Sequence, residues 1–224
     1  MIARSWHATI AVLAIAALAV QLWIAVKVSG SPASTEVGRL AGATLAGRML
    51  RVASFFTIQS NALAAITSAQ LARNPRRDGP AWRVVRLSAL VGIGVTGIVY
   101  STVLARIHQP NGWQEWSTNA VVHYVVPIMM VLGWVLFGPR PRISGRVVAW
   151  SLLFPILWFA YTLIRGELTP WYPYPFVDVV THGYPTVLVN ALLVTIVLAA
   201  VSALFWWGDL KLAPAPRAPA SVDA

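Results

Sequence analysis

Residues 185–207, PTVLVNALLVTIVLAAVSALFWW, contain no Lys, Arg, Asp or Glu. This stretch is longer than the roughly 20 residues with which a helix, rising about 1.5 Å per residue, crosses the hydrocarbon of a bilayer. Five other apolar stretches resemble it: 7–27, 52–72, 87–105, 119–138 and 147–164. No period-two alternation recurs, as the strands of a membrane β-barrel would require. The sequence therefore predicts an all-α polytopic bundle of six spanning helices.

The composition agrees with a membrane protein. Of the 224 residues, 58% are apolar and 11% are charged, and the net charge is +10; an average soluble domain has about 25% charged residues. The arginines occupy short segments between the apolar runs, which indicates membrane orientation rather than nucleic-acid binding. Cysteine is absent, which excludes disulfides and thiolate chemistry. The seven acidic residues avoid the middle of the runs, so neither a metal centre nor a paired-carboxylate hydrolase is expected.

We expect one transmembrane domain over residues 1–212 and a disordered, Pro/Ala-rich tail over 213–224. The first run is longer than the 7–15 apolar residues of a signal peptide, so an uncleaved helix is expected there. Of the 17 Lys and Arg residues, eleven fall on the side of the N-terminus and six on the other side. This bias predicts that both termini are cytoplasmic.

Three of the runs contain polar side chains. Such side chains are costly in hydrocarbon and therefore indicate candidate functional residues. Thr57 and Asn61 share one face of the second run, and Asn119 and His123 share one face of the fourth. Counted from the outer ends of their runs, Thr57 and Tyr100 lie about 7.5 Å deep and His123 about 6 Å deep. Three potentially reactive groups on three helices are therefore expected in one layer of the outer leaflet.

A threonine hydroxyl becomes a nucleophile when a neighbouring base takes its proton, and neutral imidazole is the usual base. We therefore consider Thr57 and His123 as a catalytic pair. Asn61, Gln59 or Tyr100 would donate to an oxyanion, and Asn119 or Tyr100 would orient the imidazole. The structural alternatives are a Thr57 hydroxyl bonded to its own helix and a His123 that joins two helices.

The remaining aromatic and histidine residues are assigned to the membrane surface. His7 and His108 are expected in solvent at the interfaces, whereas His182 could line the mouth of the site. The loop WYPYPF at 171–176, with Tyr172 and Tyr174, is either an aromatic anchor or a lid over the mouth. No helix carries two histidines spaced for a bis-His haem, so no cofactor is expected.

Three motifs resemble a known family. They are FFTIQSN at 55–61, Asn119–His123 with Pro127 and Trp134 further along, and WYPYPF at 171–176. Together they resemble a bacterial branch of six-helix membrane proteins related to the androgen-induced and ADTRP-like proteins of animals. The resemblance implies an atypical hydrolase with Thr57 as nucleophile and His123 as base. The animal members cleave fatty acid esters of hydroxy fatty acids, and they differ from this chain at the Gln-Ser-Asn after Thr57.

The favoured function is therefore hydrolysis of a membrane lipid ester in the inner membrane of a bacterium. The alternative is a non-enzymatic multi-pass protein: a small transporter, a channel or an assembly factor. A lipid or lipid ester is the expected partner, no nucleic acid is expected, and the oligomeric state stays open.

Overall fold

The computed structural model describes residues 1–27, 40 and 42–214. Five of its helical stretches are long and apolar enough to cross a membrane, and the number is six if a bent helix pair is counted as one span. The helices are α1 (Ile2–Lys27), α3 (Leu45–Ser54), α4 (Phe56–Arg73), α5 (Pro80–Thr102), α6 (Gly112–Ala120), α7 (Val126–Phe137), α8 (Gly145–Ser151), α9 (Leu153–Leu168) and α10 (Val179–Lys211), with short turns η1 (Leu104–Arg106), η2 (Val121–Val125) and η3 (Pro175–Val177). The all-α polytopic bundle is thus confirmed. Of the tail expected at 213–224, residues 215–224 lie outside the described part.

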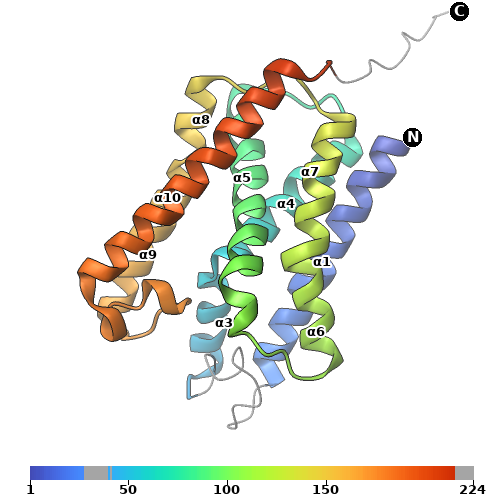
Figure 1. Ribbon diagram of the computed structural model, residues 1–224. Helices are drawn as coiled ribbons and strands as arrows, with labels where there is room; N and C mark the ends of the chain where they lie inside the picture. Colours follow the sequence, from blue (N-terminus) through green and yellow to red (C-terminus); the bar gives the residue numbers. More distant parts are fainter. Residues whose placement is uncertain (28–39, 41, 215–224) are drawn as a thin grey trace, which may run out of the picture.

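Helix α5 occupies the centre of the bundle (Figure 1). It packs against α4, α7, α8 and α10, while α1 covers α4 and α7. Small residues allow these close approaches, as expected for helix packing in lipid. A Cβ on Gly92 would lie 2.9 Å from Ser60 Oγ, and one on Gly97 would lie 3.2 Å from Pro127 Cβ. The helix positions around the site therefore depend on glycines in α5.

The second run differs from the single straight helix expected over 52–72. Helices α3 and α4 meet at an angle of 71° around Phe55, whose backbone is extended. The bend leaves Thr57 as the second residue of α4, where backbone N–H groups lack partners within the helix. Only residues 52–54 of the expected run belong to α3, which carries Arg48 and Arg51, whereas α4 holds nearly all of the rest.

The fourth run contains a wide turn. Pro127 offers no N–H, and its ring would crowd the carbonyl of His123, four residues earlier, in a regular α-helix. The chain between α6 and α7 forms the π-helical turn η2, which includes His123. Such turns re-aim side chains and are frequent at functional sites.

The helices of the third and fifth runs differ from the ranges expected from the sequence. The fifth run breaks between α8 and α9 at Leu152, three residues before Pro155. The third begins at Pro80 rather than at residue 87, so Arg86 lies within α5 and not in a loop. Arg86 is 4% exposed. His7, expected in solvent, is also buried in α1.

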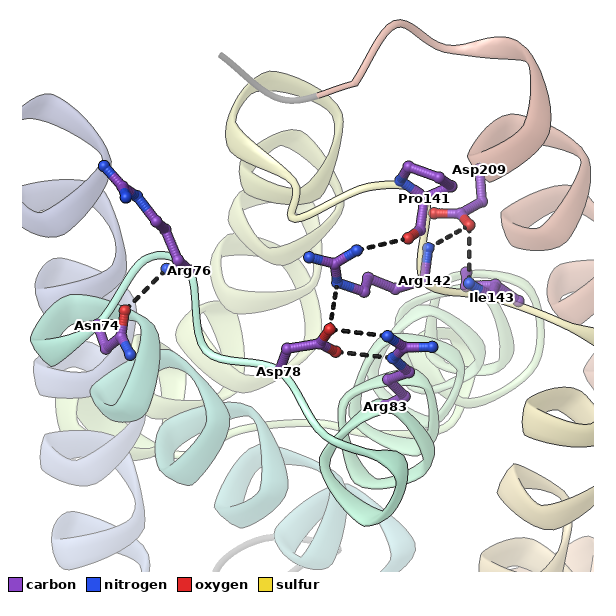
Figure 2. Close-up of polar contacts among 8 residues, drawn as sticks. All are labelled: Asn74, Arg76, Asp78, Arg83, Pro141, Arg142, Ile143 and Asp209. Atoms are coloured by element: carbon purple, nitrogen blue, oxygen red, sulfur yellow. Dashed lines mark hydrogen bonds and ion pairs between the residues drawn. The ribbon is translucent and has the colours of Figure 1, made fainter. Parts of the chain in front are cut away.

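The loops 74–79 and 138–144 and the end of α10 are joined at one end of the bundle (Figure 2). Asp78 forms ion pairs with Arg83 at 2.7 Å and with Arg142 at 3.1 Å. Asp209 accepts hydrogen bonds from the backbone N–H groups of Arg142 and Ile143, both at 2.7 Å. The start of α1 and the end of α10 lie at this same end, whereas α3, α6 and the start of α10 lie at the opposite end (Figure 1).

Candidate functional site

The bend before α4 and the π-turn η2 bring Thr57 and His123 together. Thr57 Oγ1 lies 3.4 Å from His123 Nε2. The hydroxyl is not bonded to its own helix, although many Ser and Thr hydroxyls in this chain are, such as those of Thr67 and Ser202. The usual acceptor, the carbonyl of Ala53, lies across the bend and accepts from Gln59 instead. The alternative in which the Thr57 hydroxyl is bonded to its own helix is therefore wrong.

Asn119 holds the far side of the imidazole. His123 Nδ1 lies 2.8 Å from Asn119 Oδ1 and 3.2 Å from the backbone oxygen of Asn119. A carbonyl oxygen can only accept, so Nδ1 carries a hydrogen that it donates to Asn119. In the neutral ring Nε2 is then an unprotonated acceptor that faces the Thr57 hydroxyl, which is the form that a general base needs.

The hydrogen-bond chain continues away from Thr57. Asn119 Nδ2 donates to Tyr100 Oη at 2.7 Å, and Tyr100 Oη lies 2.9 Å from His108 Nδ1. Because Tyr100 accepts from Asn119, its own hydrogen is available for His108. The Tyr100 ring also stacks on the His123 ring, with centroids 3.8 Å apart. Tyr100 thus positions His123 in two ways, and His108, expected in solvent, belongs to this chain.

Tyr174 contacts Thr57 from the other side. Its Oη accepts the backbone N–H of Thr57 at 3.1 Å and lies 3.2 Å from Thr57 Oγ1. Tyr174 is 8% exposed, so this part of the 171–176 loop faces inward and is no membrane anchor. The sequence placed Tyr174 only at the mouth of the site. No spacing rule relates a loop residue to a helix start more than a hundred residues earlier.

Tyr172 and Trp171 hold this loop in place. Tyr172 is buried against Gly166, where a Cβ would lie 2.0 Å from its ring, and it lines neither cavity at the site. The guanidinium of Arg165 lies 4.4 Å from the centre of the Trp171 ring, close enough for a cation–π contact. The loop is therefore tied to α9 on one side of Tyr174.

Three other residues that the sequence suggested for the site have no direct role in the contact between Thr57 and His123. Asn61 is fully buried and donates to the backbone oxygens of Thr57 and Val122, so it ties α4 to η2. Gln59 caps the bend through Ala53. His182 is exposed at the start of α10. None of these three side chains has a hydrogen bond to Thr57 Oγ1 or to the His123 ring among the described residues.

Two cavities adjoin Thr57. One of about 400 Å³ is mostly apolar and extends between α5, α9 and α10. The other, of about 250 Å³, is lined by His123, Tyr100, His108 and Gln21 among others. Both lie in or near the size range of small-molecule sites. In the described part of the chain, no group of three His, Cys, Asp or Glu residues is arranged to hold a metal ion.

Comparison with known proteins adds no relative: no family model, no curated protein and no solved structure matches the chain.

Proposed function

We propose that this protein hydrolyses lipid esters within the membrane, with Thr57 as the nucleophile and His123 as the general base. The observation that supports the proposal best is the 3.4 Å separation of Thr57 Oγ1 from His123 Nε2, with Nδ1 bonded to Asn119. A nucleophile, a base and a group that orients the base are the parts that acyl transfer needs. The adjoining apolar cavity suits a lipid substrate.

The reaction would proceed in two halves. His123 Nε2 takes the proton of the Thr57 hydroxyl while Oγ1 attacks the ester carbonyl. The tetrahedral intermediate collapses, and His123 returns the proton to the leaving alkoxide, so that the alcohol departs and an acyl-threonine ester remains. Water then gives a proton to His123 Nε2 and attacks the acyl carbonyl. Collapse of this second intermediate breaks the bond to Oγ1, which takes the proton back from His123, so that the fatty acid departs and the threonine hydroxyl is restored.

The oxyanion of each intermediate needs a donor close to Thr57. Tyr174 is the best placed side chain, because its Oη already lies 3.2 Å from Oγ1. Its oxygen accepts the Thr57 N–H, and a phenol is a donor as well as an acceptor. Asn61, Gln59 and Tyr100, the donors considered from sequence, are bonded elsewhere. We therefore assign the oxyanion donor to Tyr174.

A second function, that of a small transporter, a channel or an assembly factor, is favoured by one observation. Arg86 is buried in α5, and its Nη1 bonds Thr67 Oγ1 at 3.1 Å. Its Nε and Nη2 have no hydrogen-bond partner within the described residues. Charged side chains buried in spanning helices often mark ion or substrate paths.

Purified protein assayed against a panel of lipid esters separates the two functions. The Thr57→Val variant keeps the side-chain shape, so it should assemble, yet its turnover should fall by several orders of magnitude. Thr57→Ser should keep measurable activity. His123→Ala should lose about as much as Thr57→Val, and the double variant little more, as for groups that act as a unit. Ester turnover that persists in Thr57→Val would exclude the proposed mechanism.

A fluorophosphonate probe offers a second readout in detergent. Labelling that needs Thr57 supports the hydrolase. If the wild-type protein neither reacts with the probe nor cleaves any ester, the non-enzymatic function becomes the better explanation.

A further inference from the structure

The two cavities share Thr57, Leu104 and Tyr174 in their walls. His123 lines only the smaller cavity. The base must reach the leaving oxygen in order to return its proton. The alcohol portion of an ester bound at Thr57 therefore belongs on the side of the smaller cavity, which leaves the larger one for the acyl chain.

The larger cavity is elongated along the helices. On α10 its wall runs from Ala191 to Ala199, about 12 Å of helix, and along α9 it runs from Leu163 back to Leu152, the residue before the helix, about 16 Å. Tyr174 and Leu104 stand at the end that holds Thr57. The opposite end is formed where Leu152 and Ala199 lie, far along their helices from the loop that carries Tyr174.

The lining of the larger cavity is apolar, as a binding site for an acyl chain requires. Valine, leucine, isoleucine and aromatic side chains dominate it, and no charged side chain of the described residues contributes. The smaller cavity, in contrast, contains hydrogen-bonding groups of Gln21, Tyr100 and His108. The apolar lining of the larger cavity therefore suits a long acyl chain, and the hydrogen-bonding groups of the smaller cavity suit a polar alcohol.

From this geometry, and resting on the proposed hydrolase function, we infer an acyl-chain ruler. A single acyl chain lies in the cavity between α5, α9 and α10, and the end at Leu152 and Ala199 sets the longest chain accepted. The alcohol portion lies in the smaller cavity and carries a hydrogen-bonding group.

A substitution at the far end tests the ruler. Ala199→Trp should shorten the cavity, whereas Ala200→Trp adds the same bulk at the next residue, which is exposed like Ala199 but does not line the cavity. Esters of one alcohol with acyl chains of increasing length serve as substrates. The ratio of kcat/KM for the longest to that for the shortest ester should fall at least about tenfold in Ala199→Trp and stay unchanged in Ala200→Trp.

The outcomes separate the two proposals. If the wild-type protein hydrolyses esters but Ala199→Trp leaves the ratio unchanged, or both variants change it equally, the ruler is wrong and the hydrolase stands. If no ester is hydrolysed, the proposed function fails.

Binding is measured apart from turnover in the Thr57→Val protein. It is irradiated with an ester whose acyl chain ends in a diazirine. Crosslinks near Leu152 or Ala199 support the ruler, even if no ester is cleaved. Crosslinks near Gln21 would overturn it, because they would place the acyl chain in the smaller cavity.

Discussion

Tyr174 contacts both the backbone N–H and the hydroxyl of Thr57, at 3.1 Å and 3.2 Å from its Oη. A loop residue thereby fixes both the start of helix α4 and the side chain proposed as nucleophile. The phenol is the only side-chain group besides His123 that bonds Thr57 Oγ1 among the described residues. We propose that it donates to the oxygen that gains charge during acyl transfer.

Removing the Tyr174 hydroxyl should therefore slow the chemical step. Tyr174→Phe keeps the ring contacts with Phe55 and Phe176. Loss of one oxyanion donor typically lowers kcat about 100- to 1,000-fold, and we expect KM to change little. Tyr172→Phe is the matched control, because Tyr172 is also a buried tyrosine of this loop but packs against Gly166 of α9. Equal kcat values in wild type and Tyr174→Phe would exclude this role.

Asn119 should control the tautomer of His123. Asn119→Leu removes the side-chain acceptor at 2.8 Å from Nδ1 and the donor to Tyr100. The backbone oxygen of residue 119 remains, so we expect a loss in kcat/KM of about 10- to 100-fold, smaller than that of His123→Ala. Asn119→Asp restores an acceptor for Nδ1 and should recover part of the activity. If the two variants had equal activity, the Nδ1 contact would be irrelevant.

The fold class followed from the sequence because hydrophobic length is sufficient to identify a spanning helix. The bend at Phe55 was missed, since it lies close to the start of the expected run and hydropathy does not report the direction of the backbone. The π-turn at His123 had a signal in Pro127, whose missing N–H disrupts the helix four residues earlier. Arg86 was placed in a loop because the helix was expected to begin after the last charge.

The pairing of Thr57 with His123 was predicted from depth, although the argument assumed a straight second helix. The bend places Thr57 at a helix start instead, and the two groups meet because η2 faces that start. Tyr174 and His108 were not recognised as neighbours of this pair. Both belong to loops, and the distance along the chain gives no measure of how a loop folds back onto a bundle.

Topology is tested by reporter fusions. The positive-charge bias predicts cytoplasmic termini, and the structure places the start of α1 and the end of α10 at one end of the bundle (Figure 1). A reporter fused after residue 80 should therefore be cytoplasmic, and one fused after residue 112 should be on the outer side. Two fusions on the same side would show that α5 does not cross the membrane.

Acid should weaken the junction between the loops at the end shown in Figure 2. The hydrogen bond from Arg83 lowers the pKa of Asp78 from 3.8 to about 2, against a smaller opposing effect of burial. Because the pKa is lower in the folded state, this stabilisation is fully present above pH 3.8 and is lost as the pH falls through about 2. Thermal unfolding in detergent should show that wild type loses more stability over this interval than Asp78→Asn. Identical pH dependence in both proteins would contradict the assignment.

The activities of His108 and His182 variants test the hydrogen-bond chain that joins His123 to His108. His108 Nδ1 lies 2.9 Å from Tyr100 Oη, and Tyr100 both bonds Asn119 and stacks on His123. His108→Ala should therefore lower kcat/KM moderately, by about tenfold, through a misplaced imidazole. The decrease should be far smaller than that of His123→Ala. His182 is exposed at the start of α10, and His182→Ala should leave turnover unchanged.

A pH profile distinguishes a positioning role of His108 from simple loss of structure. His108→Ala should alter the pH dependence of kcat/KM, because Tyr100, which bonds Asn119 and stacks on His123, loses its partner. His108→Gln, which supplies a side-chain oxygen able to accept from Tyr100, should restore part of the rate. If instead His182→Ala abolished turnover while His108→Ala and His123→Ala did not, the base would have to be His182, and the contact between Thr57 and His123 would be structural.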